Sequence, residues 1–211
     1  MKSYLPTIPP HRMLTNGIKS SFDNGFKKYS SVKGVEIFHK NESKDDLVGA
    51  IVLKTNSKTF QQNSDVLSHE IFGPITLIVE CDSIDELKSC YTQLEGQLST
   101  TLEITENDVK ENDMSEILDF ISYNVGRVLI NGVPTGLEVT SAMHHGGPYP
   151  ACSDIRSGAV GPTALSRWVR PITYQNFGSK FQNLLPNHLR DKMIGEEKIS
   201  IREENGIWKL K

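Results

Sequence analysis

Apolar segments alternate with segments of helical period along residues 14–130, and this alternation constrains the fold more than any other feature. Residues 47–53 and 74–81 are almost continuously apolar, as expected for strands covered on both faces of a sheet. Residues 15–31 instead repeat apolar side chains at four-residue intervals, which is typical of a helix with one buried face. Strands alternating with helices predict an α/β fold, in which a parallel sheet is flanked by helices.

The same reasoning places the remaining elements of this alternation. We expect strands at 35–38, 99–104 and 128–130 and helices at 56–62, 83–94 and 114–124. Thr15 is a predicted helix cap, and Ser83 with Glu86 forms a predicted capping box, in which the two residues satisfy each other's backbone N–H groups. The apolar residues expected to face inward from the last helix are Ile117, Leu118, Ile121 and Val125.

Composition shifts divide the chain into three parts. Residues 1–13 contain three prolines and little periodicity, so we expect an extended arm. Residues 14–169 hold the alternating elements, followed from residue 131 by a long Gly-, Pro- and Ser-rich stretch and then a short helix at 162–169. Loops of this length in compact domains are usually functional or act as linkers. Residues 170–211 are expected to form a strand at 170–174 and a polar tail with a few apolar docking residues.

The composition excludes several classes of protein. With 211 residues the chain is long enough for one domain with a buried core. A formal net charge of −3 gives no basic footprint, so no nucleic-acid partner is expected. No apolar window has the length of a signal peptide core or a membrane span, and Cys81, Cys90 and Cys152 lack the paired spacing of disulfide or metal sites. We therefore expect a cytoplasmic chain without membrane contact.

A short motif precedes the apolar run at 75–79, namely His69-Glu70-Ile71-Phe72-Gly73-Pro74. It resembles the cofactor-contacting motif of aldehyde dehydrogenases. The resemblance implies that Glu70 accepts hydrogen bonds from the nicotinamide ribose hydroxyls and that Phe72 packs beside that ribose. The alternative interpretation is a helix-to-strand turn in which Gly73 and Pro74 only interrupt the backbone.

A second, longer set of residues comprises 126–136, 143–151, Ser153, Asp154, Arg156 and Gly161. This set resembles one branch of that family, the enzymes that oxidise 2,5-dioxovalerate, also called ketoglutarate semialdehyde. The match continues through 170–175 and 184–186, so it covers nearly the whole chain from Met13 onward. The resemblance implies the C-terminal part of an aldehyde dehydrogenase. In that assignment 14–169 is a partial Rossmann-like catalytic domain, and 170–211 holds the oligomerisation strand and the C-terminal tail.

The stretch from 143 to 160 has features suited to a substrate loop. Gly146-Gly147-Pro148 predicts a turn that lets backbone approach another surface closely. Ser153, Arg156 and Ser157 offer hydroxyls and a guanidinium to a carboxylate, and in the family this loop anchors the tail of the aldehyde. The alternative is that Arg156 is an exposed or structural cation.

Two adjacent histidines, His144 and His145, raise the question of a metal site. Adjacent side chains on a strand or loop point apart, and further ligands at metal-binding spacing are missing from the sequence around them, so no metal is expected. By the resemblance, His145 holds the loop through hydrogen bonding.

The family's chemistry requires groups that this sequence does not supply. In the family a cysteine thiolate attacks the aldehyde, hydride passes to NAD or NADP, and a glutamate activates water. The Gly-Gln-x-Cys pattern that carries the cysteine is not present, so no catalytic residue is assigned and the chain alone is expected to be inactive. Cys152 as a surrogate nucleophile is disfavoured, because buried thiols are ordinarily inert.

Association is expected because a partial parallel sheet exposes an apolar strand edge. The expected partners are a second copy of the chain or a complementary aldehyde dehydrogenase chain, together with a small aldehyde substrate. The alternative function is a non-catalytic oligomerisation module, which pairs with a full-length relative or a complementary N-terminal chain.

Overall fold

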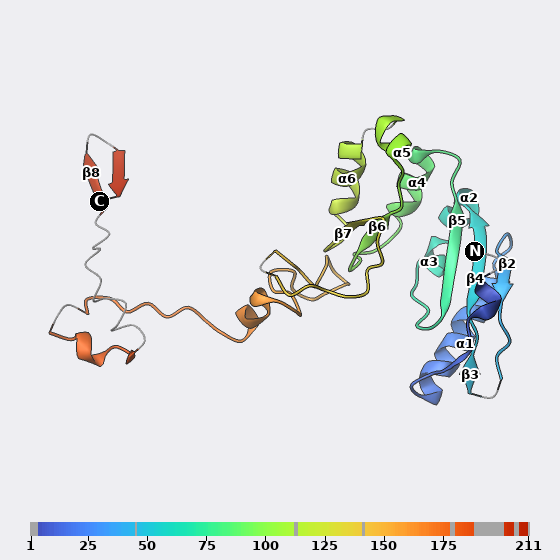
Figure 1. The fold of residues 1–211 in the computed structure, drawn as a ribbon, viewed down its shortest axis with the longest axis horizontal. Helices are drawn as coiled ribbons and strands as arrows, with labels where there is room; N and C mark the ends of the chain where they lie inside the picture. Colours follow the sequence, from blue (N-terminus) through green and yellow to red (C-terminus); the bar gives the residue numbers. More distant parts are fainter. Residues whose placement is uncertain are drawn as a thin grey trace. The chain divides into compact units, whose positions relative to one another are not determined.

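The computed structural model describes residues 4–44, 46–111, 114–140, 142–177, 180–187, 201–204 and 207–210. The chain divides into two compact units, Met1–Arg167 and Trp168–Lys211, and each is described by itself. The first unit contains the α/β elements (Figure 1). No helix among the described residues is both long and apolar enough to cross a membrane.

A three-stranded sheet forms the centre of the first unit. Its strands are β2 (Glu36–Lys40), β4 (Ile51–Asn56) and β5 (Ile75–Glu80), in the order β2-β4-β5. β4 and β5 are parallel, as predicted, with Ile51 opposite Ile75 and Asn56 opposite Glu80. β2 is antiparallel to β4, so the sheet is mixed at this edge. The short connection from β2 to β4 returns the chain without a helical crossover, which produces the antiparallel pairing.

The expectation of one continuous strand over 47–53 is wrong. The segment divides into β3 (Leu47–Val48), which pairs with β1 (His11–Arg12), and β4. Gly49 lies between the two strands, and a Cβ on it would be 2.7 Å from the carbonyl oxygen of Asn41. This close approach of two backbones breaks the strand, a position where glycine is favoured.

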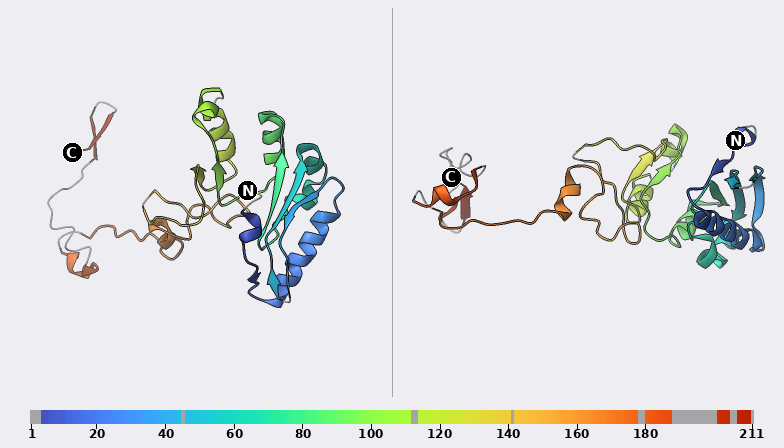
Figure 2. Two further views of the ribbon diagram at one scale, coloured as in Figure 1. Left: turned by 45° about the vertical axis from the view of Figure 1, so that its right-hand side comes forward. Right: turned by 90° about the horizontal axis from the view of Figure 1, so that it is seen from below.

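The helices of the first unit pack against the sheet through one cluster of buried side chains. They are α1 (Asn16–Ser31), α2 (Ser57–Gln62), α3 (Ser64–Leu67) and α4 (Ile84–Tyr91). The cluster includes Phe22, Tyr29, Leu53, Phe60, Leu67 and Cys90. Figure 2 shows α1 lying along the sheet. The helices predicted at 15–31 and 56–62 are confirmed, and the one predicted at 83–94 forms but ends at Tyr91. The Thr15 hydroxyl caps α1 by accepting from the Ile18 N–H at 3.2 Å.

Only half of the predicted capping box at α4 forms. The Ser83 hydroxyl accepts from the Glu86 N–H at 3.2 Å, as expected. The Glu86 carboxylate, however, accepts from the Asp82 N–H at 3.0 Å and from the Ser57 hydroxyl at 2.7 Å. The Ser57 hydrogen bond is also the main reason that the pKa of Glu86 lies below its usual range. For the Glu86 carboxylate, the Ser57 hydroxyl at the start of α2 and the Asp82 N–H therefore replace the Ser83 N–H that the capping box predicts.

A second, two-stranded parallel sheet follows, made of β6 (Thr100–Leu102) and β7 (Val128–Ile130). Between them lie α5 (Glu106–Glu111) and α6 (Met114–Ser122). Of the apolar residues predicted to face inward, Ile121 and Val125 are buried, but Leu118 is 37% exposed. The contacts of α6 with α4 come from Phe120, whose ring centre lies 5.7 Å from that of Tyr91, and from Glu116, which pairs with Lys88; Leu118 projects from the opposite side of the helix.

α5 was not predicted, although its start carries a sequence signal. The Asp108 carboxylate accepts from the Thr105 N–H at 2.7 Å, and the Thr105 hydroxyl accepts from the Asp108 N–H at 3.3 Å. This reciprocal pair is the capping box that Thr-x-x-Asp encodes.

The arm at 1–13 is attached to the first unit by short elements. It forms a 3-10 turn, η1 (Leu5–Thr7), in addition to β1, and the Leu5 side chain is buried. The Asn41 amide donates to the carbonyl oxygens of Leu5 and Ile8, both at 2.9 Å. The arm is therefore less purely extended than its prolines predicted.

The end of the first unit and the second unit differ from expectation. The short helix predicted at 162–169 is the 3-10 helix η2 (Pro162–Arg167). The strand predicted at 170–174 does not form: within the described stretch 168–177, no residue pairs in a ladder. An extended segment without a neighbouring strand has no partner for its backbone groups. The second unit holds η3 (Gln182–Leu184) and a hairpin of β8 (Ile201–Glu204) and β9 (Ile207–Leu210), which the sequence analysis missed despite the intervening Asn-Gly.

Candidate functional site

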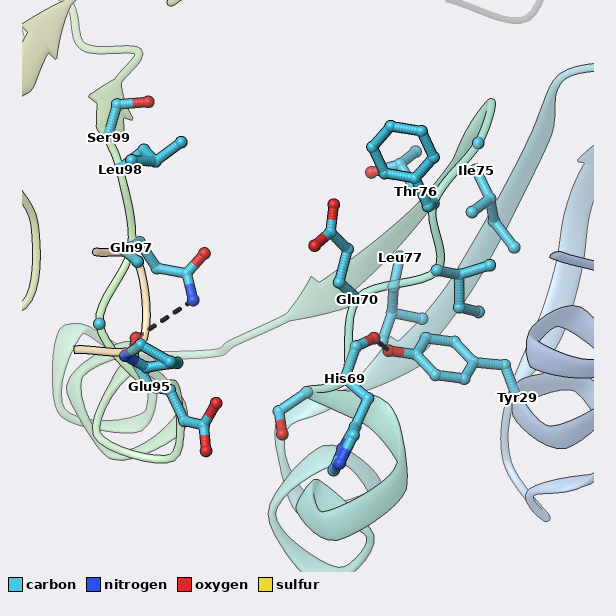
Figure 3. A pocket seen from close by; sticks show the side chains of 17 residues that line it. Tyr29, His69, Glu70, Ile75, Thr76, Leu77, Glu95, Gln97, Leu98 and Ser99 are labelled. Carbon is cyan, nitrogen blue, oxygen red and sulfur yellow. Dashed lines mark hydrogen bonds between the residues drawn. The ribbon is translucent and has the colours of Figure 1, made fainter. Parts of the chain in front are cut away.

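A cleft of about 1070 Å³ opens beside β5 in the first unit (Figure 3). Three segments line it: residues 68–73 with the beginning of β5, residues 95–99, and Pro150 with Ala151. Glu70 and Phe72, the predicted cofactor-binding residues, both lie on the first of these walls. We call this space the β5 cleft.

Helix α1 holds the wall that carries Glu70. The buried Tyr29 hydroxyl lies 2.5 Å from the carbonyl oxygen of His69 (Figure 3) and 2.7 Å from that of Leu67, so it is a donor shared by the backbone on both sides of the end of α3. Burial raises the pKa of Tyr29 to about 12, so the phenol is a neutral donor at physiological pH. Gly73 has φ +154°, and a Cβ there would lie 2.3 Å from the Phe22 ring. Residues 67–73 are therefore fixed to α1 at both ends.

This support leaves the two predicted cofactor residues free to meet a ligand. Glu70 is exposed, and the Phe72 side chain is 69% exposed. Figure 3 shows the Glu70 carboxylate directed into the cleft, whereas the His69 ring points the other way. A carboxylate accepts two hydrogen bonds from neighbouring hydroxyls, and an aromatic face packs against a sugar or a flat ring.

The third wall of the β5 cleft, formed by Pro150 and Ala151, is positioned by glycines whose backbones lie close to other segments. A Cβ on Gly147 would lie 2.3 Å from the Gln97 carbonyl oxygen, and one on Gly126 would lie 1.7 Å from the Gly146 carbonyl oxygen. The close backbone approach predicted for 146–148 is therefore confirmed, and its counterparts are the segments that lead into β6 and β7. These contacts place Pro150 and Ala151 at the cleft.

The three residues predicted to bind substrate do not line the β5 cleft. Ser153 is exposed, and the Arg156 side chain, 87% exposed, forms a bidentate pair with Asp154. Its Nε and Nη2 lie 3.0 and 2.9 Å from the two carboxylate oxygens, and these hydrogen bonds lower the pKa of Asp154 to about 2. Ser157 is buried. The structure thus favours the alternative interpretation of Arg156, a cation paired locally, and the substrate role of all three residues stays a prediction.

Arg167 is a residue that sequence reasoning missed. Its Nε donates to the Ser157 hydroxyl at 3.1 Å and its Nη2 donates to the Ser157 carbonyl at 2.9 Å, which ties η2 to the loop. Tyr29 was also missed as a functional support, because it was assigned only to the apolar stripe of α1. Neither role has a local sequence signal, since each partner lies at least ten residues away.

The cysteines have structural surroundings. The Cys152 thiol donates to the Gly147 carbonyl at 3.0 Å, within the loop that it stabilises. Burial, reinforced by the neighbouring Cys90, raises the pKa of Cys81 to about 11, so its thiol stays protonated at neutral pH. Cys90 is buried in the core cluster.

The histidine pair lies in the same loop. The His145 carbonyl accepts from the Ala159 N–H at 2.8 Å, so the backbone of His145 closes the loop. In the part of the chain that the structure describes, no three His, Cys, Asp or Glu side chains are grouped as a metal site requires.

Sequence comparison identifies long relatives of this chain, although no family model matches it. Alpha-ketoglutaric semialdehyde dehydrogenase 2 of Azospirillum brasilense is 37% identical over 185 residues, which are 87% of this chain and 34% of the relative. Alpha-ketoglutaric semialdehyde dehydrogenase of Acinetobacter baylyi is 34% identical over 192 residues, 88% of this chain and 35% of the relative. The chain therefore spans about a third of the length of these curated relatives.

Solved structures show the same fold. Salicylaldehyde dehydrogenase from Pseudomonas putida G7, complexed with salicylaldehyde, matches 78% of this chain with 32% of its own, at a TM-score of 0.55 and 18% identity. Succinic semialdehyde dehydrogenase from Streptococcus pyogenes, in complex with NADP+, matches 64% of this chain with 28% of its own, at a TM-score of 0.51 and 19% identity. The fold is thus that of part of an aldehyde dehydrogenase.

The chain belongs to the aldehyde dehydrogenase family over the part that it matches. Its sequence places it in the branch of the alpha-ketoglutaric semialdehyde dehydrogenases. Both the family and the branch indicated by the two sequence motifs are confirmed.

Proposed function

We propose that this chain is the C-terminal part of the catalytic region of an NAD(P)-dependent aldehyde dehydrogenase, and that it has no dehydrogenase activity alone. The proposed reaction of the whole enzyme is the oxidation of 2,5-dioxovalerate to 2-oxoglutarate. Both relatives are alpha-ketoglutaric semialdehyde dehydrogenases, which supports the substrate class. The observation that carries the proposal is the exposed pair Glu70 and Phe72 on the rigidly held wall of the β5 cleft.

The geometry fits one end of a dinucleotide. The Glu70 carboxylate would accept hydrogen bonds from the two ribose hydroxyls next to the nicotinamide, and Phe72 would pack beside that ribose. When bound, NAD or NADP supplies the hydride acceptor. The Tyr29 hydroxyl holds the backbone between α3 and Glu70 through hydrogen bonds of 2.7 and 2.5 Å to the carbonyl oxygens of Leu67 and His69. Because this backbone is already ordered, ribose binding costs less conformational entropy.

The remaining chemistry must come from outside these 211 residues. The sequence lacks the Gly-Gln-x-Cys pattern, and the described surroundings of Cys81 and Cys152 are those of structural thiols. In this assignment Ser153, Arg156 and Ser157 belong to the loop that faces the aldehyde tail. That part of the proposal depends on the resemblance alone.

The test is aldehyde-dependent formation of NAD(P)H by the purified chain, with and without the complementary part of a relative. We expect no formation above the protein-free rate from the chain alone. We expect measurable formation once the unmatched two thirds of the Azospirillum brasilense relative is co-expressed with it. Clear turnover by the chain alone would refute the proposal.

A second candidate function is a non-catalytic module that associates with a full-length relative or a complementary N-terminal chain. The observation that favours it is the same absence of a nucleophile pattern. It predicts a stable complex with the full-length relative and no gain in turnover, whereas the first function predicts turnover with the complementary part. Under either function we propose a cytoplasmic, oligomeric protein.

A further inference from the structure

Two of the cysteines lie together at the connection that follows β5. Cys81 comes directly after β5, and Cys90 lies in the last turn of α4. Both side chains line one hollow of about 500 Å³, whose other walls come from β5, α2 and α3. Cys90 belongs to the buried core cluster, and Cys81 packs against that cluster. The two thiols therefore share one small space, although they come from different elements.

The contacts of Cys90 hold its sulfur at the wall of this hollow. The Cys90 thiol donates to the Ser57 carbonyl oxygen at 3.7 Å, and the Gln61 amide donates to the Cys90 sulfur at the same distance. Both partners belong to α2, and Cys90 is only 7% exposed. The position of this sulfur is thus set by a neighbouring helix as well as by α4.

Cys81 is the more accessible member of the pair. Its side chain is half-buried, whereas that of Cys90 is buried. Burial is the largest cause of the raised pKa of Cys81, about 11, and the interaction with the Cys90 side chain is the next. The carboxylates of Glu86 and Asp82 act in the same direction. A small oxidant that enters from solvent therefore meets Cys81 first, with a second thiol beside it.

Cys152 has a different environment and provides an internal comparison. Its thiol donates to the Gly147 carbonyl oxygen of its own loop at 3.0 Å. It lines neither the β5 cleft nor the hollow that holds the other two cysteines. Any chemistry that depends on paired thiols should therefore spare Cys152.

We infer that Cys81 and Cys90 form a dithiol site that a hydroperoxide converts into an intramolecular disulfide. With hydrogen peroxide, the Cys81 sulfur first attacks one peroxide oxygen. The O–O bond breaks, and Cys81 becomes a sulfenic acid while one water is released. The Cys90 sulfur then attacks the Cys81 sulfur, and the hydroxyl group leaves as a second water with the Cys90 proton. The two thiols lose two electrons and two protons, and the peroxide is reduced to two waters.

The surroundings of the pair favour a slow reaction. The thiolate is the attacking form, and a pKa of about 11 leaves little thiolate on Cys81 at neutral pH. The site therefore responds to prolonged oxidation and not to a brief exposure. The reaction uses neither the cofactor nor the aldehyde, so it is independent of the proposed function.

The disulfide would connect the last turn of α4 to the end of β5. It closes a ring around the start of α4, within the connection that joins β5 to residues 95–99. The start of β5 and residues 95–99 belong to two walls of the β5 cleft. Oxidation should therefore stiffen the link between these walls.

The test is mass spectrometry of the full chain after oxidation. The reduced chain is incubated with hydrogen peroxide, free thiols are blocked with N-ethylmaleimide in urea, and the digest is searched for linked peptides. We expect a disulfide between Cys81 and Cys90 as the main product and recovery of Cys152 as a blocked thiol. Dithiothreitol should return all three cysteines to the free state.

Two further measurements separate a folded dithiol site from chance pairing in the unfolded chain. Closing a short ring lowers the entropy of the unfolded state, so oxidation should raise the folding equilibrium constant in urea about 10-fold or more. Phenylarsine oxide bridges two neighbouring thiols with loss of water and without oxidation. It should bind the wild-type chain and Cys152→Ser alike, and about 10-fold or more weaker to Cys81→Ser and Cys90→Ser, which retain one thiol of the pair.

Several results would overturn the inference. They are recovery of all three thiols after oxidation, a sulfinic acid at Cys81 without a disulfide, and disulfides to Cys152 in comparable yield. A Cys81–Cys90 disulfide that lowers stability in urea would show that the folded chain does not bring these sulfurs together. Loss of arsenical binding in Cys152→Ser would place the reactive pair elsewhere. The expected disulfide in a chain that oxidises aldehydes by itself would uphold the dithiol site and refute the proposed function.

Discussion

Removing one hydroxyl from helix α1 tests whether Tyr29 fixes the wall of the β5 cleft that carries Glu70. Tyr29→Phe leaves the ring in its buried site, where it is 8% exposed, and deletes the donor shared by the carbonyl oxygens of Leu67 and His69. Leaving buried acceptors without a donor costs about 1–3 kcal/mol, and we expect about 2 kcal/mol here because two carbonyls lose their partner. That loss lowers the folding equilibrium constant about 30-fold.

The assay is urea unfolding of the two proteins, monitored by far-ultraviolet circular dichroism. Tyr123→Phe is the matched control, because the Tyr123 side chain is 84% exposed, and it should change the unfolding free energy by less than about 0.5 kcal/mol. Hydrogen exchange should in addition become faster for the backbone of residues 68–73. Equal free energies of unfolding for the two variants would refute the role assigned to Tyr29.

The effect of Tyr29→Phe on the free energy of unfolding should depend on pH in a direction that the pKa of Tyr29 defines. Burial raises the pKa of Tyr29 from 10.0 to about 12 in the folded chain, so its unfolded form releases a proton first as pH rises. The stability contributed by Tyr29 is therefore complete below pH 10 and is lost as pH rises towards 12. The difference in unfolding free energy between the wild-type protein and Tyr29→Phe should therefore become smaller between pH 10 and pH 12. A difference that widens there would contradict the assignment of Tyr29 as a neutral donor.

Three further predictions follow from the site. Glu70→Gln should weaken NADH or NADPH binding by the reconstituted enzyme about 10-fold, because a charged acceptor is lost, whereas Asp65→Asn, at an exposed position of α3, should not weaken it. Equal titration curves for the two variants would show that Glu70 does not contact the cofactor. Gly126→Ala places a methyl group 1.7 Å from a facing carbonyl oxygen and should cost about 2 kcal/mol or more in urea unfolding, against less than about 1 kcal/mol for Gly132→Ala, where the nearest atom is 3.6 Å away. Iodoacetamide at pH 8 should alkylate Cys81 at least about 10-fold more slowly in the folded chain than in urea, since its pKa is raised from 9.0 to about 11; similar rates would show that the thiol is not shielded.

Local sequence signals predicted most of the helices and strands. Thr15 caps α1 as expected, and the apolar stripe of that helix contributes Phe22 and Tyr29 to the core. The parallel pairing of β4 with β5 follows from two apolar strands separated by helical residues. These features depend on residues that are close in the chain, so their physical causes are visible in a short window.

Errors arose where a partner lies far away in the sequence. The strand predicted at 47–53 is interrupted at Gly49, because the Asn41 backbone passes close to it. The Glu86 carboxylate accepts a hydrogen bond from Ser57 and not from the backbone at the start of its own helix. The strand predicted at 170–174 lacks a partner, because pairing is a property of two segments. A single apolar run does not encode which neighbour it will meet.

The candidate site also combines residues that a local sequence pattern predicts with contacts that depend on distant segments. The motif at 69–74 predicts Glu70 and Phe72 as the cofactor-contacting pair without any structure, because their spacing next to Gly73 and Pro74 is a local pattern. The tertiary structure separated Ser153, Arg156 and Ser157 from the cleft that holds this pair. It also showed that Arg156 is paired with Asp154 and Ser157 with Arg167.

Residues that are neighbours in the chain specify the family, the order of most elements and the pair proposed to face the cofactor, so these features can be predicted from sequence. The contacts that support and surround that pair come from segments far away in the chain and are seen only in the folded protein. Tyr29 reaches the Leu67 carbonyl across 38 residues, and glycines 126 and 147 meet backbones from other segments. Such contacts form when folding brings distant segments within hydrogen-bond reach, and no local pattern specifies them.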